Sequence, residues 1–356
     1  MKKFLSILLA SLMLTGLVGC GAGNSNNAET LPDTAENQPV DTTEDTAADT
    51  EGETEAEPVL PDSIRIGGLK GPTSMGMVKL MEDNEAGTTE NTYEFTIAAA
   101  ADELTPKFIQ GEMDIIAVPA NLASVLYNNT DGAAELLAVN TLGVIYIVEK
   151  GESVNTVADL AGKTIYATGK GSTPEYALRY ILSENGIDPD TGVTIEWKSE
   201  PTEVVGALSA AEEGIAMLPQ PFVTVAQGSV EGLRVAIDLT EAWDALDNGS
   251  TLFTGVLVVR RDFAETYPDA VKAFLTEYEA STTYINENVA DGAQLVEKYG
   301  IVKAAVAEKA IPYCNITYIA GEDMVAPMNG YLQVLFDQNP KSIGGAMPGA
   351  DFYCIP

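Results

Sequence analysis

The chain has 356 residues with 53 acidic side chains, 19 basic ones and no histidine, and its formal net charge is −34 at pH 7. A surface this acidic argues against nucleic acid as a partner, although a small anionic ligand stays allowed because the potential of a pocket is local. Without histidine, His-based triads, most catalytic zinc sites and the commonest general base at neutral pH are excluded. We expect no metal site and no cofactor.

The first 20 residues have the pattern of a secretory signal peptide. Lys2 and Lys3 precede an apolar run at residues 4–14 that is too short to span a bilayer. The run ends in LVGC at residues 17–20, which resembles the lipobox of bacterial lipoproteins, whose cysteine receives diacylglycerol. The alternative is an ordinary secreted protein with an unrelated cysteine. We expect Cys20 to anchor the protein to the outer face of the cytoplasmic membrane.

Residues 21–62 contain twelve acidic residues and neither lysine nor arginine, with threonine, alanine, asparagine and proline between them. Such a segment buries too little apolar surface to offset the entropy lost on ordering, and its charges repel one another. We interpret it as a disordered acidic tether between the lipid anchor and the folded part. Calcium binding is the less favoured alternative.

The most informative pattern is a weak repeat at an offset of 100 residues. A strand beginning at Ile64 leads into KGPT at residues 70–73 and a helix; a strand at residues 164–167 leads into GKGST at residues 169–173 and another helix, which stops at Asn185. Two further strands also correspond between the copies. They lie at residues 93–97 and 193–197, and at residues 114–118 and 215–218.

Each copy thus alternates strands and helices, which predicts an α/β lobe with a parallel sheet. The apolar runs at residues 136–148 and 252–259 are interpreted as two segments that cross between the lobes. Lobe 1 would comprise residues 63–150 and 252–356, and lobe 2 residues 151–251. The remainder is mainly helical, beginning with an amphipathic helix at Tyr267-Pro268-Asp269.

In open α/β sheets, ligands bind beyond the carboxyl ends of the strands. The two lysine–glycine loops offer backbone N–H groups and hydroxyls there, and their ligand-binding candidates are Lys70, Gly71, Pro72, Thr73, Ser74, Met75, Lys170, Gly171, Ser172 and Thr173. Helix capping is the alternative reading, and Ser172 with Glu175 fits a capping box. Both roles can hold, because backbone donors remain after one hydroxyl caps the helix.

Two further loops follow the third strand of each copy. They supply the candidates Pro119, Asn121, Gln220 and Pro221. The amide side chains of Asn121 and Gln220 could read a polar heterocycle, and simple helix entry is the alternative. Asn140 interrupts an apolar strand and either contacts ligand or fixes the hinge. No arginine lies in the four loops, which favours a neutral or zwitterionic solute over a strongly anionic one.

Besides Cys20, the chain has only Cys314 and Cys354. In an oxidising compartment these could form a disulfide that ties the C-terminal tail to the body. The alternative is two independent buried thiols.

Several short motifs, taken in order, resemble the nitrate, sulfonate, taurine and thiamine-precursor group of ABC transporter substrate-binding proteins. They are GEMDI at residues 111–115, LAGKTI at 160–165, GSTPEYAL at 171–178 and LPQPFVT at 218–224. The resemblance implies the type II periplasmic-binding fold: two lobes, each a mostly parallel sheet flanked by helices, joined by two crossing segments. It also implies a small organic ligand, namely a sulfonate, a taurine-like compound, a thiamine pyrimidine or another heterocycle.

The sequence therefore favours a monomeric receptor that captures solute by hinge closure and delivers it to an ABC permease. A sensory lipoprotein that presents ligand would use the same cleft. An extracellular enzyme on this fold is disfavoured, because the four loops contain no acidic residue to act as base or nucleophile.

Overall fold

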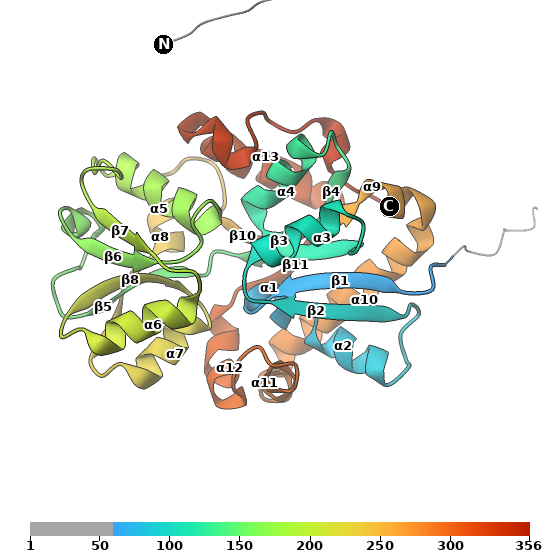
Figure 1. The fold of residues 1–356 in the computed structure, drawn as a ribbon, viewed down its shortest axis with the longest axis horizontal. Coiled ribbons are helices and arrows are strands. Elements are labelled where there is room, and N and C mark those ends of the chain that lie inside the picture. Colours follow the sequence, from blue (N-terminus) through green and yellow to red (C-terminus); the bar gives the residue numbers. More distant parts are fainter. Residues whose placement is uncertain (1–59) are drawn as a thin grey trace, which may run out of the picture. The chain divides into compact units, whose positions relative to one another are not determined.

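The computed structural model describes residues 60–356; the expected signal peptide, Cys20 and nearly all of the acidic tether lie outside the described residues. The described chain forms two lobes, each built on one sheet (Figure 1). Lobe 1 has the strand order β11-β4-β10-β3-β1-β2, and lobe 2 has β7-β6-β8-β5-β9. The strands are β1 (Ile64–Leu69), β2 (Tyr93–Ala98), β3 (Ile115–Pro119), β4 (Ala134–Leu142), β5 (Ile145–Lys150), β6 (Thr164–Ala167), β7 (Thr194–Trp197), β8 (Gly214–Pro219), β9 (Leu233–Asp238), β10 (Phe253–Arg260) and β11 (Ile316–Ala320).

Helices flank both sheets, as the alternating pattern predicts. They are α1 (Pro72–Met75), α2 (Val78–Glu85), α3 (Thr105–Ile109), α4 (Ala120–Asn129), α5 (Thr173–Glu184), α6 (Pro201–Ala210), α7 (Phe222–Ser229), α8 (Leu239–Asp244), α9 (Arg261–Thr266), α10 (Pro268–Glu287), α11 (Val289–Lys298), α12 (Ala304–Ala310) and α13 (Glu322–Gln338). The predicted end of α5 at Asn185 and the predicted start of α10 at Pro268 are both confirmed.

The repeat at an offset of 100 residues is visible in the topology. In lobe 1, β1 pairs in parallel with β2 on one side and β3 on the other. In lobe 2, β6 pairs in the same way with β7 and β8. The mixed α/β fold with two sheets is therefore confirmed, but the expected mostly parallel sheets are not, because β4, β5, β9, β10 and β11 all pair antiparallel.

The strands that follow each copy exchange partners. β5 follows the first copy but pairs antiparallel with β8 and β9 of lobe 2, whereas β10 follows the second copy but pairs antiparallel with β3 and β4 of lobe 1. Each sheet is therefore completed by a strand that comes directly from the other lobe. The exchange accounts for two connections between the lobes.

The predicted lobe boundary after Lys150 needs correction. β4 ends at Leu142 in lobe 1 and β5 begins at Ile145 in lobe 2, so the first crossing is the short link at Gly143 and Val144. A Cβ atom at Gly143 would lie only 2.1 Å from Thr240 Oγ1, so this link passes close to α8. Residues 136–148 read as one strand because β4 and β5 are both buried on both faces, and even the polar Asn140 and Thr141 are buried, so no exposed residue within either strand marks the change of sheet. The second crossing precedes β10, which lies wholly in lobe 1.

The cysteines follow the alternative reading. Cys314 and Cys354 are free, buried thiols in this structure, and Cys314 Sγ lies 3.8 Å from Met75 Sδ. Burial raises the pKa of both thiols above its ordinary value. Both side chains belong to the apolar core between the lobe 1 sheet and helices α2, α10 and α11, so their role here is packing. In the described part of the chain, no helix is long and apolar enough to cross a membrane.

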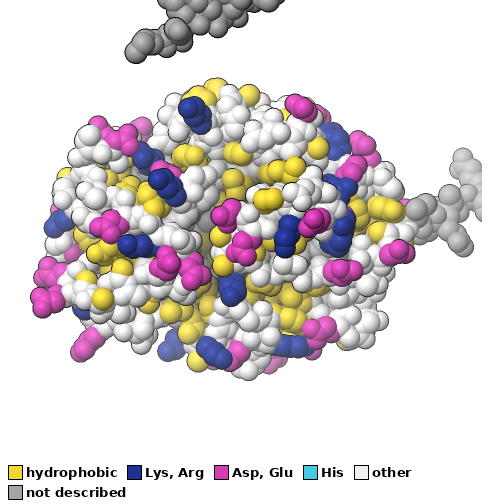
Figure 2. All heavy atoms as spheres, viewed as in Figure 1, with side chains coloured by type: hydrophobic (Ala, Val, Ile, Leu, Met, Phe, Trp, Pro, Cys, Tyr) yellow, Lys and Arg dark blue, Asp and Glu magenta, His cyan; other side chains and the backbone are white. Residues whose placement is uncertain are grey.

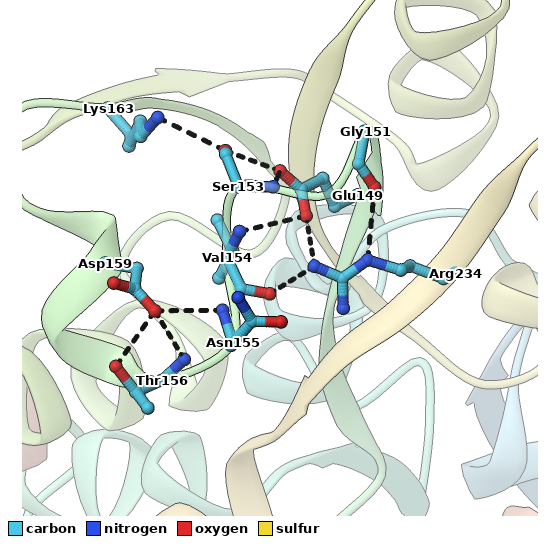
Figure 3. A network of polar contacts seen from close by, with 9 residues as sticks. All are labelled: Glu149, Gly151, Ser153, Val154, Asn155, Thr156, Asp159, Lys163 and Arg234. Carbon is cyan, nitrogen blue, oxygen red and sulfur yellow. Dashed lines mark hydrogen bonds and ion pairs between the residues drawn. The ribbon is translucent and has the colours of Figure 1, made fainter.

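A buried carboxylate holds the loop that follows β5 in lobe 2 (Figure 3). Glu149, near the end of β5, accepts hydrogen bonds from the backbone N–H groups of Ser153 and Val154 and from Arg234 Nη2 at 2.8, 3.1 and 2.5 Å. Burial raises the pKa of the Glu149 carboxyl, but the hydrogen bonds outweigh burial and leave the pKa below its usual value. In lobe 1, Asp114 pairs with Arg65.

Candidate functional site

A cavity of about 500 Å³ opens between the lobes, at the ends where β1, β3, β6 and β8 lead into their helices. The space-filling view shows a hollow between the two lobes (Figure 2). The volume lies within the range typical of sites for small organic ligands. Its lining comes from both lobes: Leu69, Lys70, Gly71, Pro72, Thr73, Ala99, Ala100, Ala101, Asp102, Thr105, Pro119, Leu122, Thr141 and Thr254 from lobe 1, and Val144, Thr168, Gly169, Lys170, Gly171, Ser172, Pro174, Lys198, Ser199, Pro201, Pro219, Gln220 and Phe222 from lobe 2.

Residues 70–73, called the first turn here, connect β1 to α1 and all line the cavity. Gly71 is the N-cap of α1 and has extended backbone. Ser74 and Met75 donate their backbone N–H groups to the Gly71 carbonyl, and the Gly71 N–H itself has no acceptor among the described residues. The first turn therefore has an unpaired backbone donor at a residue that lines the cavity.

Residues 169–172, called the second turn, connect β6 to α5 and also line the cavity. Gly171 has a φ of 75°, in the left-handed region that favours glycine. Its N–H is already used, because it donates to Glu175 Oε2 at 2.6 Å. The predicted capping box is therefore modified: Glu175 reaches back to Gly171, while Ser172 Oγ donates to the Gly169 carbonyl at 2.8 Å.

The loops after the third strands contribute less than expected. Pro119 and Gln220 line the cavity, whereas Asn121 and Pro221 do not. Gln220 Oε1 accepts hydrogen bonds from the backbone N–H and hydroxyl of Thr224, which leaves the Nε2 hydrogens without a partner among the described residues. Gln220 is therefore a side-chain donor at the cavity wall.

Five of the residues expected to contact ligand are buried in the protein interior and do not line the cavity. Asn121, Asn140, Ser74, Met75 and Thr173 have no exposed surface and are absent from the lining. Asn140 is absent from the lining, and its Nδ2 donates to the Thr73 carbonyl at 3.3 Å, so it supports the first turn from strand β4.

Three lysines and one acidic residue line the cavity, so side-chain cations are present although the four loops hold no arginine. Lys70 and Lys170 are exposed and form no ion pair with any described residue. Lys198 lies 3.3 Å from Glu196 Oε2. Asp102 is the acidic residue in the lining. On an acidic chain, this local excess of positive charge favours an anion.

Sequence reasoning missed Lys198 and Ser199, although the repeat contains a signal for them. They follow β7 as Ala99 and Ala100 follow β2, 99 residues earlier, and all four line the cavity. Applying the strand-end rule to the second strand of each copy would have found them.

A second hollow, of about 730 Å³, lies at the edge of lobe 1 away from the cavity, where β10 ends and α9 begins. Its arginines are already neutralised: Arg260 pairs with Asp262 and Asp114, and Arg261 pairs with Glu135 and Asp351. Although it is larger, it receives residues from one lobe only and offers no free cation. We therefore regard the cavity between the lobes as the candidate site.

Comparisons with known proteins agree with this assignment. Residues 82–310 match the family model described as ABC transporter, phosphonate, periplasmic substrate-binding protein. A protein of Brucella abortus that is named as a binding protein is 24% identical over 217 residues, which cover 60% of this chain and 65% of that protein. The chain thus spans slightly less than two thirds of the curated relative's length.

Solved structures share the fold. An ABC transporter protein from Parabacteroides distasonis has a TM-score of 0.68 at 21% identity and covers 83% of this chain and 99% of its own. The alkanesulfonate-binding protein of Xanthomonas axonopodis pv. citri has a TM-score of 0.65 at 16% identity, with 81% and 96% covered. The nitrate-binding protein of Synechocystis PCC 6803 has a TM-score of 0.58 at 14% identity, with 79% and 82% covered. Because the family model spans well over half of the chain, this protein belongs to the phosphonate periplasmic substrate-binding protein family of ABC transporters.

Proposed function

We propose that this protein is the extracytoplasmic solute receptor of an ABC importer and that it binds a small organic oxoanion, a phosphonate or a sulfonate, in the cavity between the lobes. The observation that carries the proposal is the lining, because turns from both copies of the repeat meet across one cavity. A ligand that contacts both lobes stabilises the closed arrangement over an open one, which is how such a receptor signals occupancy to a permease.

The donors around the cavity suit an oxoanion. Such a head group carries only acceptors, and the site offers the Gly71 N–H, the Gln220 Nε2 hydrogens and the ammonium groups of Lys70 and Lys170. Hydrogen bonds from charged donors are roughly twice as strong as those between neutral groups. The solved relatives that are named for alkanesulfonate and nitrate bind oxoanions, which supports the same ligand chemistry here.

The apolar part of the lining suits the organic part of the ligand. Leu122, Phe222 and Pro119 contribute hydrophobic surface to the same cavity. A purely inorganic anion would leave this surface in contact with water, whereas a short alkyl group would cover it. We therefore favour an organic phosphonate or sulfonate over nitrate.

The anchor and the partner form part of the same proposal. Cys20 would hold the receptor at the outer face of the cytoplasmic membrane, and residues 21–62 would give the lobes reach toward a permease. Metabolic labelling with a fatty acid analogue tests the anchor, since the label should be incorporated by the full-length precursor and not by a Cys20→Ser variant.

A thermal-shift panel tests the ligand class. It would contain methylphosphonate, ethanesulfonate, taurine, nitrate and a neutral hydroxymethylpyrimidine. We expect the phosphonate or a sulfonate to raise the melting temperature, because ligand at 100 times its Kd adds about 2.7 kcal/mol to the free energy of unfolding. The ligand should be recovered unchanged. If no oxoanion shifts melting while the neutral pyrimidine does, the ligand class is wrong.

Lysine variants test the location. Lys70→Met and Lys170→Met should each weaken binding of the responding oxoanion about tenfold or more, because each removes a charged donor. Lys309→Met is the matched control, since Lys309 is exposed on α12 and absent from the lining. Equal losses in all three variants would mean that net charge, and not this cavity, governs binding.

A further inference from the structure

One buried hydroxyl joins the two lobes beside the cavity. Thr173, the first residue of α5 in lobe 2, has no exposed surface. Its Oγ1 lies 3.0 Å from the Tyr331 hydroxyl of α13, which belongs to the C-terminal part of the chain in lobe 1. It also donates to Asn121 Oδ1 at 3.3 Å and accepts from the Asn121 N–H at 3.4 Å. The last two distances are long, so the contact with Tyr331 is the strongest of the three.

The position of this hydroxyl links it to both halves of the cavity. Thr173 follows Ser172 directly, and Ser172 ends the second turn. Asn121 is the second residue of α4 in lobe 1, two residues after Pro119, which lines the cavity from that lobe. The hydroxyl therefore joins the beginnings of two helices whose preceding residues face each other across the cavity.

Apolar packing surrounds the same point. The Tyr331 ring lies 5.9 Å from the ring of Trp243 in lobe 2 and 5.8 Å from that of Phe253 at the start of β10. Trp243 is also fully buried. Tyr331 of lobe 1 packs against Trp243 of lobe 2, and we call this contact between the lobes the seam. Separation of the lobes at the seam would expose the indole of Trp243 to solvent.

We propose that Thr173 is a positioning residue: its hydroxyl ties α5 to α4 and α13, favours the closed arrangement of the lobes, and so sets the width of the cavity. This inference rests on the proposed function only in assigning a ligand to that cavity. In the closed arrangement the Thr173 and Tyr331 hydroxyls are both buried and bond to each other. Removal of either hydroxyl leaves the other buried with one partner fewer, which raises the free energy of the closed arrangement.

The test needs no ligand. Trp197→Phe leaves Trp243 as the only tryptophan, and acrylamide quenching of its fluorescence then reports how often the seam opens. Thr173→Val removes the hydroxyl and keeps the shape. We expect the population with an exposed indole to rise about fivefold, the effect of one net hydrogen bond. Tyr331→Phe should give a similar rise, and the double variant little more, because both changes remove the same bond.

Thr276→Val is the matched control. Thr276 is exposed on α10 and its hydroxyl bonds only to the Lys272 carbonyl of the same helix, so quenching should not change. Unchanged quenching in both Thr173→Val and Tyr331→Phe would overturn the inference; if Thr173→Val fails to fold, Tyr331→Phe alone decides. The proposed function is judged separately by adding methylphosphonate or ethanesulfonate, which should reduce quenching in the parent. If quenching rises in Thr173→Val but neither compound changes it in the parent, the role of Thr173 is supported and the proposed ligand class is wrong.

Discussion

The first and second turns have similar sequences, KGPT at residues 70–73 and GKGS at residues 169–172. The glycine after the lysine nevertheless differs between them in backbone conformation and in hydrogen bonding. Gly71 is extended and its N–H faces no protein acceptor, whereas Gly171 is left-handed and its N–H is bound by Glu175. The difference follows from the position four residues after each glycine, which holds Met75 in the first copy and Glu175 in the second.

The two side chains at that position have opposite consequences. Met75 is buried in the core of lobe 1, and its thioether sulfur is only a weak hydrogen-bond acceptor. Glu175 is also buried, pairs with Arg179 and turns its other oxygen to the second turn. A repeat thus preserves the path of the chain while a single side chain decides whether a backbone donor is left for a ligand. We infer that the first turn supplies amide recognition and the second supplies mainly charge, through Lys170.

The largest expected effect is a difference in the free energy of unfolding between the valine variants of Gly71 and Gly171. Gly171→Val should lower the free energy of unfolding by about 1–3 kcal/mol, because a β-branched residue is strained at a φ of 75°. Gly71→Val should leave stability nearly unchanged, since its backbone is extended and its Cβ would meet no atom within 4 Å. That Cβ would instead occupy the cavity rim and block approach to the amide, so ligand binding should be lost.

Urea denaturation and calorimetric titration of both variants measure these effects. Equal stability of the two valine variants would show that the glycines are equivalent after all. Retained binding by Gly71→Val would remove the first turn from the site.

A smaller effect is expected when the carboxylate of the second turn is removed. Glu175→Ala should destabilise the protein by about 2 kcal/mol, because a charged hydrogen bond to Gly171 and an ion pair to Arg179 are lost. Binding of the oxoanion should become severalfold tighter, since the Gly171 N–H is released and a nearby negative charge disappears. Weaker binding, measured by titration under identical salt, would mean that Glu175 serves the ligand by ordering the turn.

The smallest effect concerns a carboxylate far from the cavity. Glu149→Gln should cost about 1 kcal/mol at pH 7 and leave oxoanion binding unchanged. Because the folded-state pKa of Glu149 is below its usual value, its ionised form stabilises the protein above the unfolded pKa of about 4.3. This contribution is lost as the pH falls through the folded value.

Denaturation curves of the parent and Glu149→Gln should therefore differ at pH 7 and converge once the pH falls below the folded-state pKa of Glu149. A stability difference that does not change with pH would assign the effect to packing instead of charge.

The sequence was sufficient for the parts of the fold that depend on local pattern. Strand alternation, the glycine and proline punctuation and the helix stop at Asn185 all act over a few residues, and the two sheets follow from them. The lobe boundary was misplaced because β4 and β5 are both buried on both faces, so their hydrophobicity does not distinguish them.

The site was predicted at the level of loops and less well at the level of side chains. Thr173 looks like Thr73 in the sequence, but it turns to Tyr331, which is 158 residues away. Lys198, which pairs with Glu196, joins the lining from a strand end that the sequence analysis did not consider. Such choices depend on distant packing partners, which a single sequence does not reveal.

The central claim is that both turns hold one oxoanion between the lobes. A crystal structure with the methylphosphonate or ethanesulfonate that responds in the thermal-shift panel tests it most directly. We predict that the oxygens of the ligand lie within hydrogen-bonding distance of the Gly71 N–H in lobe 1 and of Lys170 Nζ in lobe 2. Ligand bound at the Arg260 hollow, or in contact with one lobe alone, would contradict the claim.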